Sequence, residues 1–195
     1  MNTFGKILCV KLCISILLVL GSCMRHVENR EFCYAFLYEN DSVPSYWILN
    51  RISINNSVRV DTTYVYENKN KLVDKKIDIF RVGSGKMDKL LGNKLNGSFL
   101  PYLTIETSEC QEFQYGEQEL DEMFSTKFCF LETYEKMEIS GKIFENVQKF
   151  KKVSVYSGIE SLVYYDQDFM LLKEEYVSGM TQGYRIVRID SCFIY

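Results

Sequence analysis

The sequence predicts a mainly β fold: a meandering antiparallel arrangement that forms a curved sheet or half-barrel, with one or two short helices. Three observations predict it. Apolar and polar side chains alternate with a period of two, the alternating stretches are rich in Tyr, Phe, Val and Ile, and turn residues separate them at near-regular spacing. Only two prolines occur in 195 residues. Short strands of this composition are typical of antiparallel sheets.

The first 22 residues have the layout of an export signal. Lys6 and Lys11 flank the start of an apolar run that ends at Leu20. Leu20-Gly21-Ser22-Cys23 resembles the lipobox of bacterial lipoproteins. That resemblance implies cleavage of signal peptide 1–22 and acylation of Cys23, for instance with palmitate. It also implies attachment to a membrane of the bacterial cell envelope, which we expect to be the outer membrane. A plain secretory signal and an uncleaved anchor are the alternatives.

After the signal we expect a polar tether over residues 23–30 and one β-rich domain over residues 31–195. The formal net charge of −3 gives the chain no general attraction to nucleic acid, so we expect no nucleic-acid partner. The expected contact with the membrane is the lipid anchor alone.

The clearest strand pair covers Tyr46–Ile54 and Val58–Glu67. In the second stretch Val58, Val60 and Thr62 share one face, and Asn55-Asn56-Ser57 supplies a turn between the two strands. Turn residues also bound the other predicted strands, which are Lys76–Val82, Tyr102–Thr107, Lys127–Lys136, Lys142–Lys151, Glu160–Tyr165, Phe169–Val177 and Gly183–Asp190.

Two short segments are helix candidates. Lys86–Leu91 follows Gly83-Ser84-Gly85, which we interpret as a flexible connection between a strand and a helix. Gly116–Phe124 has acidic residues at its start, where they suit the helix dipole.

The stretch Leu162–Tyr176 predicts a hairpin that turns near Asp166-Gln167, and its strands are apolar on both faces. Such strands need cover on both sides of the sheet or a concave face that holds a ligand. Together with GKIFENVQKFKK and YRIVRID, this stretch resembles the closing strands of small, uncharacterised envelope lipoproteins of the Bacteroidota. It is similar, more loosely, to the curved sheets of Lol lipoprotein carriers. No functional residue follows from either resemblance. Four residues of the hairpin could face a ligand: Tyr164, Tyr165, Phe169 and Leu171.

The sequence lacks most of the residue patterns that mark catalytic and metal-binding sites. The only histidine is His26, so histidine triads and histidine metal sites are ruled out, and we expect neither a metal nor a cofactor. Four cysteines beyond Cys23 could remain free or form disulfides, and their spacing leaves the pairing open: Cys33, Cys110, Cys129 and Cys192. We expect the single tryptophan, Trp47, to pack in the core.

Three functions remain open. The first is a non-catalytic envelope lipoprotein whose β-domain binds a protein or another envelope component. The second is a carrier of a lipid or other apolar ligand on the concave face of the sheet. The third, and most remote, is a glycan hydrolase that uses two carboxylates from an acid-rich run. This run comprises Glu106, Glu109, Glu112, Glu117, Glu119, Asp121 and Glu122. We expect no enzyme activity, because a solvated acidic face is the commoner role of such a run.

Overall fold

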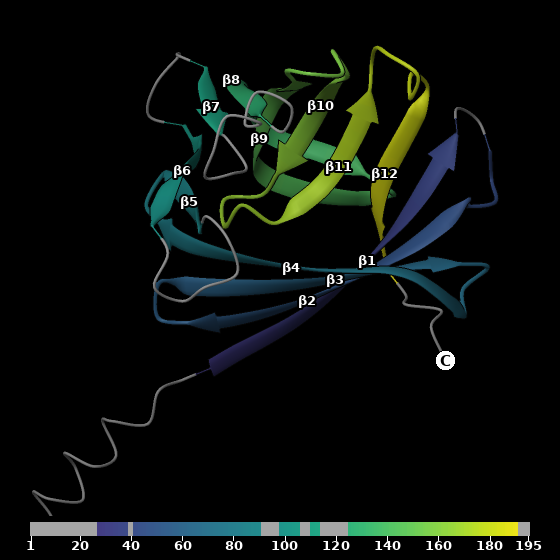
Figure 1. Ribbon diagram of the computed structural model, residues 1–195, viewed down its shortest axis with the longest axis horizontal. Helices are drawn as coiled ribbons and strands as arrows, with labels where there is room; N and C mark the ends of the chain where they lie inside the picture. Colours follow the sequence, from purple (N-terminus) through teal and green to yellow (C-terminus); the bar gives the residue numbers. More distant parts are fainter. Residues whose placement is uncertain (1–26, 39–40, 91–97, 106–109, 114–124, 191–195) are drawn as a thin grey trace, which may run out of the picture.

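A computed structural model describes residues 27–38, 41–90, 98–105, 110–113 and 125–190 of the chain. These residues form one twelve-stranded antiparallel sheet (Figure 1). The strands are β1 Val27–Tyr38, β2 Tyr46–Asn55, β3 Val58–Glu67, β4 Lys71–Gly83, β5 Lys86–Leu90, β6 Phe99–Thr104, β7 Gln111–Phe113, β8 Thr126–Ile139, β9 Lys142–Ser154, β10 Glu160–Tyr165, β11 Leu171–Tyr176 and β12 Tyr184–Ile189. The predicted antiparallel fold is therefore confirmed.

The strand order is β6-β5-β4-β3-β2-β1-β12-β11-β10-β9-β8-β7, so the first strand pairs with the last at the centre of the sheet. The sheet curves until its two ends, β6 and β7, lie against each other. Aromatic packing closes this seam. The ring of Tyr102 on β6 lies 5.3 Å from that of Phe113 on β7 and 4.8 Å from that of Phe128 on β8. The result is a nearly closed, barrel-like sheet.

Two of our expectations about local structure were wrong. Lys86–Leu90 is a strand, not the start of a helix, and it pairs with both β4 and β6. Ser84 and Gly85 form a two-residue hairpin turn with Gly85 at φ 70°, in place of the flexible connection that we predicted. The apolar spacing of Met87 and Leu90 suits a helix, but pairing on both sides overrides it. The other helix candidate, Gly116–Phe124, lies outside the described residues.

The structure also adds strands that we did not predict. β1 begins at Val27 and pairs with β2 along its length, so residues 27–30 belong to the sheet and not to the tether. The short strand β7 lies within the acid-rich run and pairs with β8. The predicted turn at Asn55-Asn56-Ser57 is confirmed, with Asn56 at φ 56°, and the Glu160–Tyr165 strand has the predicted bounds.

The two faces of the sheet carry separate apolar clusters. The inner face holds Phe80, Met87, Leu103, Phe128, Phe150 and Phe169, all buried. A second cluster joins the β8–β9 hairpin to β10, β11 and β12, and it consists of Ile139, Val147, Tyr164 and Leu172. Strands that are apolar on both faces are therefore covered on both sides, which is one of the two arrangements that we expected for the 162–176 hairpin.

The turn between β10 and β11 is held by the carboxylate of Asp166. This carboxylate accepts hydrogen bonds from the backbone N–H groups of Asp168 (3.0 Å) and Met170 (2.9 Å). Phe169 adopts φ 55° and is 1% exposed in the inner cluster. Burial raises the pKa of Asp166 despite these hydrogen bonds. The hairpin turn that we predicted here is confirmed.

Candidate functional site

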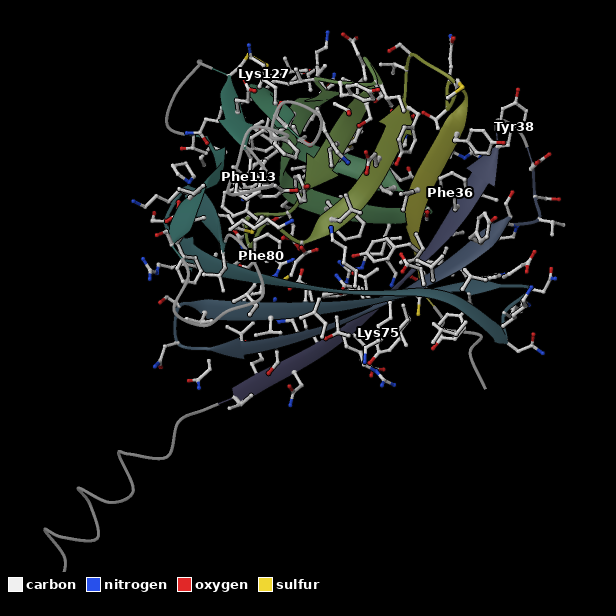
Figure 2. The ribbon with its side chains drawn as sticks, viewed as in Figure 1. Phe36, Tyr38, Lys75, Phe80, Phe113 and Lys127 are labelled. Carbon is white, nitrogen blue, oxygen red and sulfur yellow. A yellow bond between two sulfur atoms is a disulfide. The ribbon has the colours of Figure 1, made fainter. Side chains whose placement is uncertain are left out.

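Five aromatic side chains gather on the inner face where β1, β2, β11 and β12 meet. We call them the aromatic cluster: Phe36, Tyr38, Tyr46, Tyr176 and Tyr184. Figure 2 labels Phe36 and Tyr38 near the end of β1, on the opposite side of the molecule from Phe80 and Phe113. The aromatic cluster is thus separate from the seam.

The rings of the aromatic cluster contact one another closely. Phe36 stacks on Tyr184 with ring centroids 5.0 Å apart, and Tyr38 lies 4.7 Å from Tyr184. Tyr46 and Tyr176 pack against Phe36 edge-on, at 6.1 and 6.3 Å. These contacts arise because Tyr38 pairs with Tyr184 and Phe36 pairs with Tyr46 across neighbouring strands.

Part of the aromatic cluster is open to solvent. Tyr38 and Tyr46 are each 39% exposed, whereas the other three side chains are half-buried. Burial and the negative charge of Glu174 raise the pKa of Tyr176 to about 12, so its phenol stays protonated at neutral pH. The aromatic cluster therefore offers apolar ring faces together with hydroxyl groups that can form hydrogen bonds.

A buried polar group borders the aromatic cluster on the inner face. Glu174 accepts hydrogen bonds from the Ser161 hydroxyl (2.7 Å) and from Lys152 Nζ (2.9 Å). Ser161 is the cross-strand partner of Tyr176. Burial disfavours the charged form of Lys152, but the attraction of Glu174 outweighs it and the pKa of Lys152 is raised. An ion pair with a further hydrogen bond thus lies directly beside the aromatic rings.

Two further ion pairs lie on the inner face, nearer the β10–β11 turn. Arg59 pairs with Asp61, and both side chains are almost fully buried. Lys89 Nζ lies 2.8 Å from Asp78 and also close to the rings of Tyr102 and Phe113. The interior of the sheet is therefore a mixture of aromatic side chains and paired charges.

The four residues proposed to face a ligand lie in different environments. Tyr164 is buried in the second cluster, and its hydroxyl donates to Glu175 at 3.2 Å. Tyr165, the next residue, points to the opposite face, where its ring packs 5.9 Å from that of Phe150. Phe169 is part of the inner cluster, and the carbonyl of Leu171 accepts a hydrogen bond from Tyr34. The structure therefore brings Tyr165 and Phe169 to the same inner cluster but places Tyr164 on the other face of the sheet.

Of the acidic run, only Glu112 lies within the described residues, and it is exposed on β7.

Trp47 is half-buried on the outer face, with Lys69 Nζ 4.8 Å from the centre of its ring. Because Tyr46 precedes it on the same strand, the two side chains point to opposite faces, and Trp47 is not part of the aromatic cluster. Cys23 lies outside the described residues.

The described residues also show two disulfide-bonded positions, at the seam and on β1. Cys110 and Cys129 form a disulfide between the start of β7 and β8, and Cys33 is disulfide-bonded as well. Among the residues that the structure describes, no three acidic, cysteine or histidine side chains group to hold a metal ion. The described part of the chain also contains no helix able to span a membrane.

Sequence reasoning missed most of the aromatic cluster, although a signal for part of it was present. Phe32, Tyr34, Phe36 and Tyr38 place an aromatic ring at every second position in the second half of β1.

Comparisons with known proteins give no further guide to function, since no family model, curated protein or solved structure matches this chain.

Proposed function

We propose that this protein is a non-catalytic lipoprotein of the bacterial cell envelope, anchored through acylated Cys23, and that its β-domain binds a protein or another envelope component. The observation that carries the proposal is the partly exposed aromatic cluster on four paired strands. Tyrosine is over-represented among residues that dominate binding energy, because its ring supplies apolar area while its hydroxyl supplies a hydrogen bond.

The course of β1 supports this role for the aromatic cluster. An anchor at Cys23 would lie only a few residues before Val27, where β1 begins. Phe36 lies nine residues further along the strand, or about 30 Å at 3.3 Å per residue. In a lipid-anchored protein the cluster would therefore lie far along β1 from the attachment point, where other envelope components could contact it.

The packing of the inner face favours surface binding over the carrier alternative. Phe128 and Phe150 are 2% and 1% exposed, and Phe169 from the β10–β11 turn packs against the same cluster. An apolar ligand in this part of the concave face would have to displace these rings. The aromatic cluster needs no such rearrangement to contact a partner.

In-cell photocrosslinking tests the proposal on the full-length protein. A photoreactive phenylalanine analogue replaces Tyr38 in one strain and Tyr156 in another, as a matched control. Tyr156 is 67% exposed, lies in the β9–β10 turn and is not one of the five cluster residues. We expect a discrete crosslinked species from position 38 that is absent from position 156. It should be lost when Tyr46 and Tyr184 are both changed to Ala. Equal crosslinking from both positions would refute the assignment of the cluster.

A further inference from the structure

A groove on the outer face lies between the sheet and the tip of the β8–β9 hairpin. Its volume is about 310 Å³. Leu37 of β1 and Val187 of β12 form an apolar floor, and Ile139 from the hairpin closes one side. Lys173 and Arg185 bring two positive charges to it, and Glu138 contributes one carboxylate. The groove lies on the opposite face of the sheet from the aromatic cluster.

Strand register explains why these side chains meet. Arg185 is the cross-strand partner of Leu37, and Val187 is the cross-strand partner of Lys173. All four therefore project from the same face, in two adjacent rows. The β8–β9 hairpin is held near them by an ion pair of 2.6 Å between Lys142 and Asp190. The groove thus has a floor on the sheet and one wall made by a hairpin tip.

Arg185 carries a buried donor that lacks a partner among the described residues. Its Nε is shielded from solvent and makes no hydrogen bond with any of them. No ion pair joins Arg185 to Glu138, which is exposed, or to Glu175. Glu175 is already bound by Lys173 Nζ at 2.7 Å and by the Tyr164 hydroxyl at 3.2 Å. A guanidinium is always charged and has only donors, so Arg185, as a lining residue, favours an anionic acceptor in the groove.

We propose that this groove binds a small amphiphilic monocarboxylate. The carboxylate accepts hydrogen bonds from Arg185, and the apolar part of the ligand lies along Leu37, Val187 and Ile139. The volume is at the lower end of the range of about 300 to 1,000 Å³ for small-molecule sites, which suits a medium-length chain. The exposed carboxylate of Glu138 disfavours a second negative charge at the other end of the ligand.

Titration with octanoate tests this proposal, using ¹⁵N-labelled protein that starts after Cys23 and has its disulfides formed. Octanol and the dicarboxylate suberate serve as ligands of similar length. Concentrations should reach about 10 mM, because ligands of about ten non-hydrogen atoms often reach only millimolar affinity. We expect saturable shifts of the backbone amides of Leu37, Arg185 and Val187. We also expect octanol and suberate to bind at least about tenfold more weakly than octanoate.

Two variants identify the group that binds the carboxylate. Arg185→Gln should weaken octanoate binding by about tenfold or more, whereas Arg51→Gln should leave it unchanged. Arg51 is an exposed arginine of β2 that pairs with Glu31 and lies outside this groove. Lack of saturable shifts in the wild-type protein, or equal binding by octanol, overturns the proposal even if a variant fails to fold. Neither result bears on crosslinking at the aromatic cluster, so the two proposals fail independently.

Discussion

Arg59 on β3 donates a hydrogen bond from Nη1 to the carbonyl oxygen of Phe169, 110 residues away, at 2.9 Å. Its Nε also donates to Asp61 at 2.6 Å, and both residues are buried. One guanidinium therefore neutralises a buried carboxylate and fixes the β10–β11 turn, which supplies Phe169 to the inner cluster. The two halves of the sheet are linked through this side chain.

Replacing Arg59 with Ala should destabilise the protein strongly. The change leaves Asp61 buried without its cation and leaves the Phe169 carbonyl without this donor, so we expect the free energy of unfolding to fall by about 3 to 5 kcal/mol. Urea denaturation, followed by tryptophan fluorescence, measures the change. The control is Arg51→Ala, which removes an exposed ion pair with Glu31 and should lower the free energy of unfolding by about 1 kcal/mol or less. Equal losses would contradict this role of Arg59.

Acid should lower the free energy of unfolding, in part because Asp78 becomes protonated. Burial favours the neutral form of this carboxyl, but the positive charges of Lys89 and Lys76 outweigh it and hold the pKa below its ordinary value of 3.8. Between the folded and unfolded pKa values the unfolded chain binds more protons, so the free energy of unfolding falls as the pH drops through that range. This contribution is fully present at neutral pH.

Urea denaturation of the wild-type protein and of Asp78→Asn, between about pH 5 and about pH 2, measures the effect. The variant should be less stable than the wild type at neutral pH, because Lys89 loses its nearest anion at 2.8 Å. It should also lose less stability on acidification. If the free energy of unfolding of the variant falls as steeply on acidification as that of the wild type, the Asp78–Lys89 pair does not contribute to the acid sensitivity.

The Cys110–Cys129 disulfide should stabilise the domain by restricting the unfolded chain. The two cysteines are 19 residues apart in sequence, and closing a loop of this length is worth about 3 kcal/mol in the chain-entropy model. We expect a loss of about this size in the Cys110→Ala, Cys129→Ala double variant, measured by urea denaturation under oxidising conditions. The double variant should lose further stability on reduction, because Cys33 is also disulfide-bonded.

Membrane attachment should depend on Cys23. In a bacterial host, the wild-type protein should incorporate labelled palmitate and sediment with membranes, whereas Cys23→Ser should do neither. The matched control is Cys9→Ser, in the expected signal peptide, which should leave labelling unchanged. Retention of the label in the Cys23→Ser variant would refute the lipid anchor as we propose it.

The local pattern of the chain was enough to predict much of the sheet. Alternating side chains in Tyr46–Ile54 and Val58–Glu67, with asparagines between them, predicted the β2–β3 hairpin. The same signal failed for β1. Its aromatic residues alternate with Cys33, Ala35 and Leu37, so both faces are apolar and the period of two is hidden. It also failed for Lys86–Leu90, where pairing with two neighbouring strands decided the conformation.

The sequence by itself determined most of the strand-forming segments and several of their tight turns, because side-chain alternation and turn chemistry depend only on nearby residues. The tertiary structure alone decided which side chains meet. Tyr38 lies against Tyr184, and Leu37 beside Arg185, only because β1 pairs with β12 across the middle of the sheet. Such pairings join segments that are far apart in the chain, and no local pattern specifies their order. Both proposed sites depend on that pairing.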